Sequence, residues 1–122
     1  MFTFDHVHIV CRDIPAMGAF LEVLGARERV RNEATKNWEY DLAGMRIFVR
    51  AHREGETFGP GTIRRDGLDH LAFTVPDLDA AVARLVAAGA RVAIGPTQVR
   101  PDLATCFVEG PDGLYLEVIW RG

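Results

Sequence analysis

The sequence lacks the segments that would direct a protein into or across a membrane. No apolar run approaches the ~20 residues that a transmembrane helix needs. The first ten residues, MFTFDHVHIV, have neither the basic region nor the long apolar stretch of a signal peptide. The only cysteines are Cys11 and Cys106, too few for a disulfide framework, and they are expected to be buried thiols. We therefore expect a cytoplasmic protein with no membrane partner.

The sequence also lacks an excess of basic residues. Its 14 lysines and arginines against 17 aspartates and glutamates give a net charge of −3, which argues against nucleic acid as a partner. At 122 residues the chain is long enough for one domain, and 48% hydrophobic and 25% charged residues are ordinary for a globular protein. These values favour a single domain, residues 1–122, with a small molecule as its partner.

What the sequence does contain is an internal duplication. The pair Asp5-His6 recurs as Asp69-His70, and the residues that follow match without a gap through Arg27 and Arg91. The identical pairs after the histidines are Asp13/Asp77, Ala16/Ala80, Ala19/Ala83, Leu21/Leu85, Gly25/Gly89, Ala26/Ala90 and Arg27/Arg91. Because a repeat that only builds a core does not need a histidine, the duplication indicates chemistry as well as structure.

Each copy predicts a strand, a helix and three further strands. Alternating residues predict the opening strands, Asp13 and Asp77 are natural helix N-caps, and Gly25 and Gly89 end the helices. The later strands are expected near 26–31, 36–42, 45–51, 91–94, 104–108 and 114–120, with turns at 43–44 and 111–113.

The duplication defines the predicted fold class. Module one covers about 1–52, a linker rich in glycine and charge covers about 53–67, and module two covers about 68–122. Since one four-stranded sheet with one helix leaves a face uncovered, two such βαβββ units are expected to pair. This predicts an α+β fold with a curved mixed-sheet cleft that brings the two repeated histidines together.

A carboxylate near the end of the chain completes a candidate metal site. Glu117 lies in an otherwise apolar predicted strand, where a buried carboxylate is costly without a partner or a metal. His6, His70 and Glu117 form a two-histidine, one-carboxylate set, which suits one divalent ion, Fe, Mn, Zn, Ni or Co. An edge-strand carboxylate facing water is the alternative for Glu117.

Three segments resemble the vicinal oxygen chelate superfamily, which includes glyoxalase I, methylmalonyl-CoA epimerase, extradiol dioxygenases, fosfomycin-modifying enzymes and bleomycin-binding proteins. They are DHVHIVCRDI, LDHLAFTVPDLDAAVARLVAAGARV and FVEGPDGLYLEV. The resemblance implies the glyoxalase/dioxygenase fold and a homodimer, with or without exchange of halves between the chains. It also implies that His6, His70 and Glu117 occupy ligand positions of the first, fifth and eighth strands.

One position departs from the glyoxalase I pattern. Aligning Gly44 with Gly113 places Phe48 opposite Glu117, where the resemblance implies a fourth ligand that a phenylalanine cannot supply. This favours a site with three ligands and open coordination positions.

Other residues are candidates for the same cleft. His8 shares the face of His6 and is a candidate general acid or base, or simply a hydrogen-bonded histidine. Tyr115 shares the face of Glu117 and is the best candidate for a hydroxyl near the metal. Glu117 is also a candidate for assisting proton movement.

Four further residues are candidates for substrate binding beside Phe48. Arg46 and Arg50 share its face and suit an anionic substrate, or else protect the sheet edge. Trp38 is a candidate aromatic wall, with core packing as the default, and His52 is a candidate for the cleft mouth or a solvated strand end.

The favoured function is a metal-dependent enzyme of this superfamily that chelates and polarises a small oxygenated substrate. Isomerase or lyase chemistry and dioxygenase chemistry both stay open. A non-catalytic protein that binds a small molecule or antibiotic is one alternative, and a fosfomycin-type thiol transferase is another.

Overall fold

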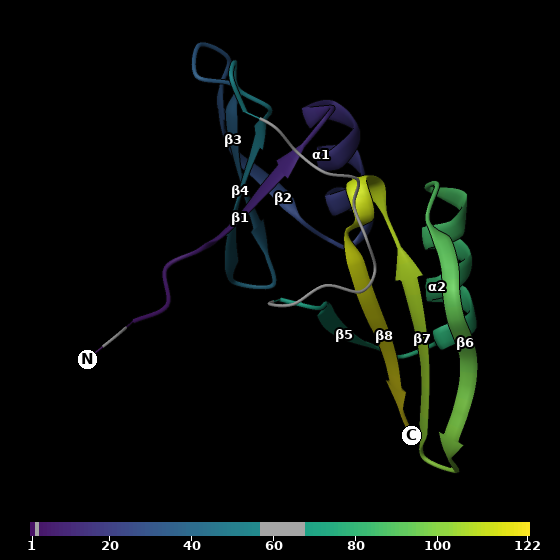
Figure 1. Ribbon diagram of the computed structural model, residues 1–122. Helices are drawn as coiled ribbons and strands as arrows, with labels where there is room; N and C mark the ends of the chain where they lie inside the picture. Colours follow the sequence, from purple (N-terminus) through teal and green to yellow (C-terminus); the bar gives the residue numbers. More distant parts are fainter. Residues whose placement is uncertain (2, 57–67) are drawn as a thin grey trace. The chain divides into compact units, whose positions relative to one another are not determined.

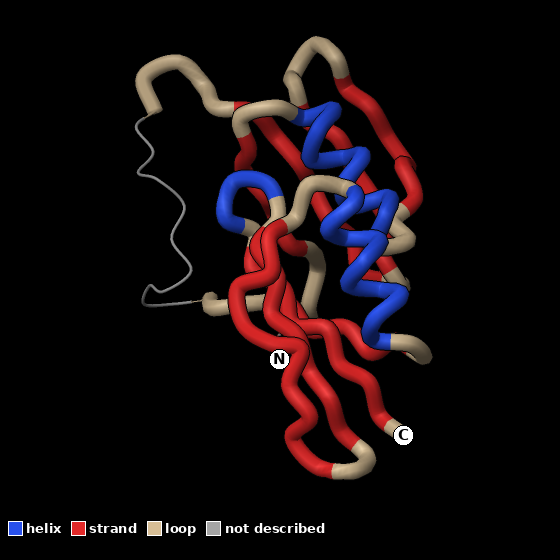
Figure 2. Tube along the Cα trace, turned by 90° about the vertical axis from the view of Figure 1, so that its right-hand side faces the viewer, coloured by secondary structure: helices blue, strands red, loops and turns tan. Residues whose placement is uncertain are grey.

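A computed structural model describes residues 1, 3–56 and 68–122. It divides into two compact units, Met1–Phe58 and Gly59–Gly122. Most of the predicted linker lies outside the described residues. Figure 1 follows the elements along the chain, and Figure 2 separates helices from strands by colour.

Each unit contains one four-stranded mixed sheet and one helix. The first sheet has the order β1-β4-β3-β2, and the second has the equivalent order β5-β8-β7-β6. In each sheet the opening strand pairs in parallel with the last strand, and the other pairs are antiparallel. The elements of the first unit are β1 (Val7–Cys11), α1 (Ile14–Val23), β2 (Arg27–Asn32), β3 (Asn37–Leu42) and β4 (Met45–Ala51). Those of the second are β5 (Leu71–Val75), α2 (Leu78–Ala87), β6 (Arg91–Arg100), β7 (Leu103–Glu109), a short 3₁₀ turn η1 (Pro111–Gly113) and β8 (Tyr115–Arg121).

The helix boundaries follow the predicted caps. The carboxylate of Asp13 accepts a hydrogen bond from the backbone N–H of Ala16, and Asp77 makes the same contact with Ala80, each at 3.0 Å. These bonds satisfy backbone donors that the first helical turn leaves free. The α+β organisation with two βαβββ modules is therefore confirmed.

One face of the first sheet is covered by α1. Ile47 and Val49 of β4 are fully buried, and Tyr40 of β3 is 1% exposed. Helix α1 lies close to the sheet at Gly18, where an added Cβ would lie 2.1 Å from the hydroxyl oxygen of Tyr40. Because strand side chains alternate, Phe48 lies on the other face of the sheet, together with Arg46 and Arg50.

The second sheet repeats this division. The buried residues Cys106, Val108, Leu116 and Val118 alternate with residues of intermediate exposure along β7 and β8. Glu117 therefore lies on the face that α2 does not cover. Among the described residues, no helix is long and apolar enough to cross a membrane.

Two boundary predictions are wrong. The opening strands begin later than expected, at Val7 and Leu71, so His6 and His70 immediately precede the strands rather than lying within them. Strand β6 is longer than the predicted 91–94 and runs to Arg100 through several register shifts. Irregular pairing with β7 carries the strand past Gly95 and Pro96.

Candidate metal centre

Both repeated histidines are bound by the aspartate that precedes them. The Nδ1 atom of His70 lies 2.7 Å from a carboxylate oxygen of Asp69, and His6 makes the same close contact with Asp5. Each carboxylate reaches the ring that follows it because the two Asp-His pairs lie outside the regular strands. With Nδ1–H donating to a carboxylate, Nε2 keeps its lone pair for a metal.

In the second unit, the free nitrogen of His70 faces Glu117. The Nε2 atom lies 3.3 Å from a carboxylate oxygen of Glu117, and the two side chains are 30% and 20% exposed. Glu117 is on β8, the strand that pairs with β5, so the residue just before one strand and the middle of its neighbour supply the two groups. Two of the three predicted ligands therefore meet within one module.

Two aromatic rings surround this pair. Tyr115 and Phe107 stack on one another at 5.4 Å, and their centroids lie 6.2 and 5.4 Å from the His70 ring. Tyr115 is thus near His70, as its shared face with Glu117 predicted. Phe107 was missed, although its place is a consequence of strand register, since it pairs directly with Glu117 across β7 and β8.

In the first unit, Phe48 takes the place that Glu117 has in the second. Its ring lies 4.7 Å from His6, edge to face, and 5.7 Å from His8. His8 pairs with Phe48 in the sheet, as Ala72 pairs with Glu117. The predicted break in symmetry between Phe48 and Glu117 is present in the two sheets.

In the first unit, a carboxylate is found on the strand next to the one that carries Phe48. Glu39 on β3 pairs directly with Phe48 on β4, whereas Phe107 on β7 pairs directly with Glu117 on β8. Each module therefore has one glutamate and one phenylalanine in this cross-strand pair, with the two residue types exchanged. Only the second module places its carboxylate on the strand beside the histidine.

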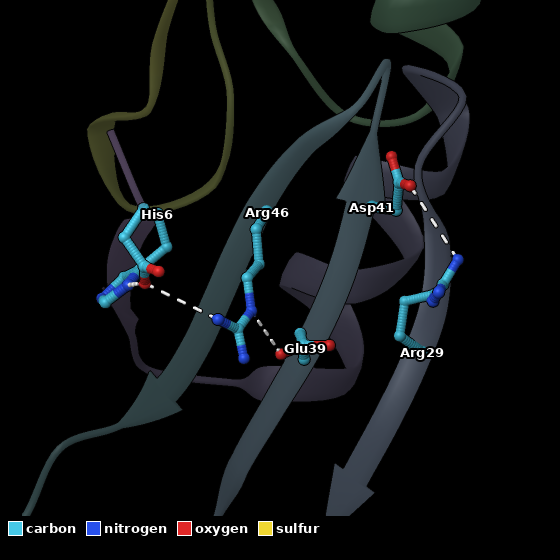
Figure 3. Close-up of polar contacts among 6 residues, drawn as sticks. His6, Arg29, Glu39, Asp41 and Arg46 are labelled. Atoms are coloured by element: carbon cyan, nitrogen blue, oxygen red, sulfur yellow. Dashed lines mark hydrogen bonds and ion pairs between the residues drawn. The ribbon is translucent and has the colours of Figure 1, made fainter. Parts of the chain in front are cut away.

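The two candidate arginines are each bound to carboxylates. Arg46 donates to Glu39 at 2.7 Å and lies 3.6 Å from Asp5. Figure 3 shows the Arg46 side chain reaching Glu39. Arg50 contacts both oxygens of Glu56, at 2.6 and 2.8 Å. Both guanidinium groups therefore have acidic partners, and a role for the two arginines in binding an anionic substrate stays a prediction.

Two other predicted substrate contacts have different surroundings. Trp38 is 6% exposed and pairs with Val49, so it lies on the face covered by α1, opposite to Phe48. The prediction of Trp38 as a wall of the site is wrong, and its alternative, core packing, is correct. His52 follows β4 and is exposed, and its place at a cleft mouth stays a prediction.

The surroundings of His8 and of Glu56 lower the pKa values of these two side chains. Desolvation, followed by the positive charge of Arg50, lowers the pKa of His8, which favours a neutral ring able to accept a proton. The hydrogen bonds from Arg50 and from the backbone N–H of Arg53 lower the pKa of Glu56 to about 2.

The described part of the chain holds no group of three histidine, cysteine or acidic side chains close enough to bind a metal together. His70 and Glu117 form a pair in one unit, and His6 belongs to the other unit. The complete set of three ligands stays a prediction.

A model of the glyoxalase/bleomycin resistance protein/dioxygenase superfamily matches residues 5–107. The uncharacterized protein YaeR of Escherichia coli is 34% identical over 118 residues, covering 93% of this chain and 92% of the relative. Among solved structures, a glyoxalase family protein of Bacillus cereus has a TM-score of 0.84 at 20% identity, covering 100% of this chain and 96% of the other. The fosfomycin resistance protein FosX of Listeria monocytogenes has a TM-score of 0.77 at 18% identity, covering 100% and 93%. At these identities the structural matches show the fold.

Proposed function

Because the chain belongs to the glyoxalase/bleomycin resistance protein/dioxygenase superfamily, we propose that it is an enzyme that uses one divalent metal to polarise a small oxygenated substrate. His70, Glu117 and His6 would hold the metal. The observation that carries the proposal is the pair formed by His70 Nε2 and Glu117, whose distance and chemistry fit two ligands of one ion.

The spacing of this pair can be compared with ordinary coordination geometry. Metal–nitrogen bonds of about 2.0–2.1 Å and metal–oxygen bonds of about 2.0–2.2 Å, at angles between octahedral and tetrahedral, place the two ligand atoms about 2.8–3.5 Å apart. The observed 3.3 Å between Nε2 and Oε2 falls within this range. An ion could bind between the two groups with little movement of either side chain.

The neighbouring aspartates support the same assignment. Asp69 accepts a hydrogen bond from Nδ1 of His70, and Asp5 does so for His6, which leaves Nε2 of both rings as the ligand atom. A carboxylate behind a metal-bound histidine fixes its tautomer and raises its basicity. A histidine that served only the core would not require this partner.

The bound metal would act as a Lewis acid that stabilises negative charge developing on a substrate oxygen. His8 lies one pleat from His6, with its pKa lowered, and would accept a proton from the substrate as a general base. Tyr115 would help to exclude water beside His70, since it is 7% exposed and stacked on Phe107. We propose isomerase or lyase chemistry, or dioxygenase chemistry, as the reaction class.

Manganese is a sensible first metal to test. A structure of a FosX variant from Listeria monocytogenes, with a TM-score of 0.73 and 17% identity to this chain, is described as a complex with Mn(II). Mixed nitrogen and oxygen ligands also accept Fe, Zn, Ni and Co. The anion-binding chemistry that a phosphonate substrate needs has less support, because Arg46 and Arg50 are bound to carboxylates.

The experiment measures metal content and metal affinity on the same preparations. Protein purified without chelator should hold close to one divalent ion per chain, and apoprotein should bind Mn²⁺ in calorimetry. Glu117→Gln and His70→Ala should each weaken binding by at least about 100-fold, since loss of a ligand costs more than the 10–100-fold typical of its supporting groups. Glu33→Gln, an exposed carboxylate between β2 and β3, is the control and should bind normally.

A panel of α-ketoaldehyde–thiol adducts, acyl-CoA thioesters and catechols would then define the reaction class. If neither native nor reconstituted protein binds an ion, and His6→Ala leaves the affinity for the panel compounds unchanged, the metalloenzyme proposal fails. The alternative would then be a binding protein without chemistry.

We also propose a homodimer, and light scattering that gives a monomer mass at working concentration would contradict it.

A further inference from the structure

His6 stands just outside the sheet of its own module. The pairing of β1 with β4 begins at Val7, which is opposite Ile47, so regular strand pairing starts one residue after the histidine. The contacts described for its ring are with Asp5, Phe48 and His8. Asp5 is itself exposed, with 69% of its side chain accessible. The orientation of the ring therefore depends on what holds Asp5 and Phe48.

Arg46 contacts both of these residues. Its guanidinium lies 3.6 Å from the same Asp5 oxygen that binds Nδ1 of His6, and its central carbon lies 4.8 Å from the Phe48 ring. On its other side Nε donates to Glu39 at 2.7 Å. Figure 3 shows Arg46 with contacts toward Glu39 on one side and toward the group around His6 on the other. A guanidinium suits this place because it is planar and carries several donors in fixed directions.

The second module holds its histidine in a different way. When the final hairpins are aligned on Gly44 and Gly113, Tyr115 occupies the place of Arg46. On the sheet side, His70 faces the carboxylate of Glu117, whose oxygen lies 3.3 Å from Nε2. In the first module Phe48 has no carboxylate to face the histidine. The charged residue on β4 is Arg46, which contacts Asp5, and Asp5 in turn contacts His6.

We infer that Arg46 is a positioning residue for His6, which holds Asp5 against Nδ1 so that Nε2 points away with its lone pair free. Arg46 stands on the paired strand β4, and its bond to Glu39 of β3 fixes the guanidinium to the sheet. The chain of contacts from Glu39 through Arg46 and Asp5 to His6 transfers the rigidity of the sheet to a residue that precedes it. This assignment rests on the proposed metal function for its purpose, but the contacts themselves are independent of any metal.

The first test therefore uses apoprotein. Long-range ¹⁵N–¹H NMR at pH 8 reports which imidazole nitrogen carries the proton. His6 is expected to be largely Nδ1-protonated, and Arg46→Met should shift it toward the Nε2-protonated form while His70 stays unchanged as an internal reference. Methionine keeps an unbranched stem beside Phe48 and removes only the guanidinium. Arg29→Met removes an arginine of the same sheet, paired with Asp41 at 3.9 Å, and should leave His6 unchanged.

A double-mutant cycle tests whether the effect passes through Asp5. Asp5→Asn removes the charge that Arg46 binds, at an exposed position before β1 where folding of the sheet is not at risk. It should shift the His6 signals in the same direction, and Arg46→Met should add nothing further in that background. Unchanged His6 signals in Arg46→Met or in Asp5→Asn, or a full additional shift in the double variant, would overturn the inference.

The second readout is Mn²⁺ affinity, which should fall about 10-fold in Arg46→Met, within the range for groups that orient metal ligands. If no variant or wild-type protein binds metal, the proposed function fails while the NMR result still decides the role of Arg46. If wild-type protein binds metal and Arg46→Met binds it equally well with unchanged His6 signals, the positioning role fails alone.

Discussion

Replacing Gly18 with alanine tests the packing of helix α1 against the sheet that carries Phe48 and Arg46 on its other face. Two effects oppose each other at this position. Alanine is better than glycine in a helix interior by about 0.8–1.0 kcal/mol. The added Cβ, however, would lie 2.1 Å from the hydroxyl oxygen and 2.9 Å from Cζ of Tyr40.

The contact should outweigh the propensity. Tyr40 is 1% exposed, so its ring cannot turn out into solvent, and relief requires a shift of the helix or the strand. Overpacking of this kind costs about 1–3 kcal/mol, with the upper end appropriate to so short a contact. We expect Gly18→Ala to lower the free energy of unfolding by about 1–2 kcal/mol after the gain in propensity is subtracted.

Urea denaturation followed by circular dichroism measures this change. Ala19→Gly, the reverse substitution at the exposed neighbouring helix position, calibrates propensity and should cost about 1 kcal/mol. In a Tyr40→Phe background the nearest atom is gone, and Gly18→Ala should cost less than half as much. If Gly18→Ala stabilises the protein by the propensity value alone, the packing argument is refuted.

Three other results follow from the candidate site. Phe48→Glu should give His6 a carboxylate at the position that Glu117 has beside the second histidine and strengthen Mn²⁺ binding about 10-fold, so equal or weaker binding in calorimetry would contradict the equivalence of the two positions. Glu56 has a pKa lowered to about 2, so the stability from its pair with Arg50 is present above about pH 4.5 and lost as the pH falls through about 2. An NMR titration should show this low pKa, and Arg50→Met should return it toward the ordinary value, whereas a Glu56 midpoint near 4.5 in the wild type would exclude the pair. Chelation of the metal should lower the thermal midpoint of reconstituted protein, and added Mn²⁺ should restore it, because an ion that binds only the native state stabilises it.

Much of the fold could be predicted because its signals are local. The caps at Asp13 and Asp77 act through the backbone of the next three residues, and the alternation along β3, β4, β7 and β8 reflects burial of one sheet face. The sequence also predicted that Phe48 stands in the first module where Glu117 stands in the second, since equivalent hairpins in a repeat have equivalent registers. Strand β6 was the exception, because irregular pairing with β7 extended it beyond its local signals.

The surroundings of the site residues were less predictable. Arg46 and Arg50 were correctly assigned to the face of Phe48, yet their carboxylate partners lie on a neighbouring strand and beyond the end of β4. Trp38 was placed at the site although its parity matches that of the buried Tyr40. Phe107 was missed because its position beside Glu117 depends on the register of β7 and β8.

By itself, the sequence determined the two βαβββ modules, the repeated Asp-His pair and the break in symmetry at Phe48. Each of these depends on residues close in the chain or on comparison of one copy with the other. The tertiary structure decided that Glu117 comes within 3.3 Å of His70 and that Arg46 joins Asp5 to Glu39. Such contacts depend on which strands become neighbours, in which register, and on the directions that long charged side chains then take to reach an opposite charge.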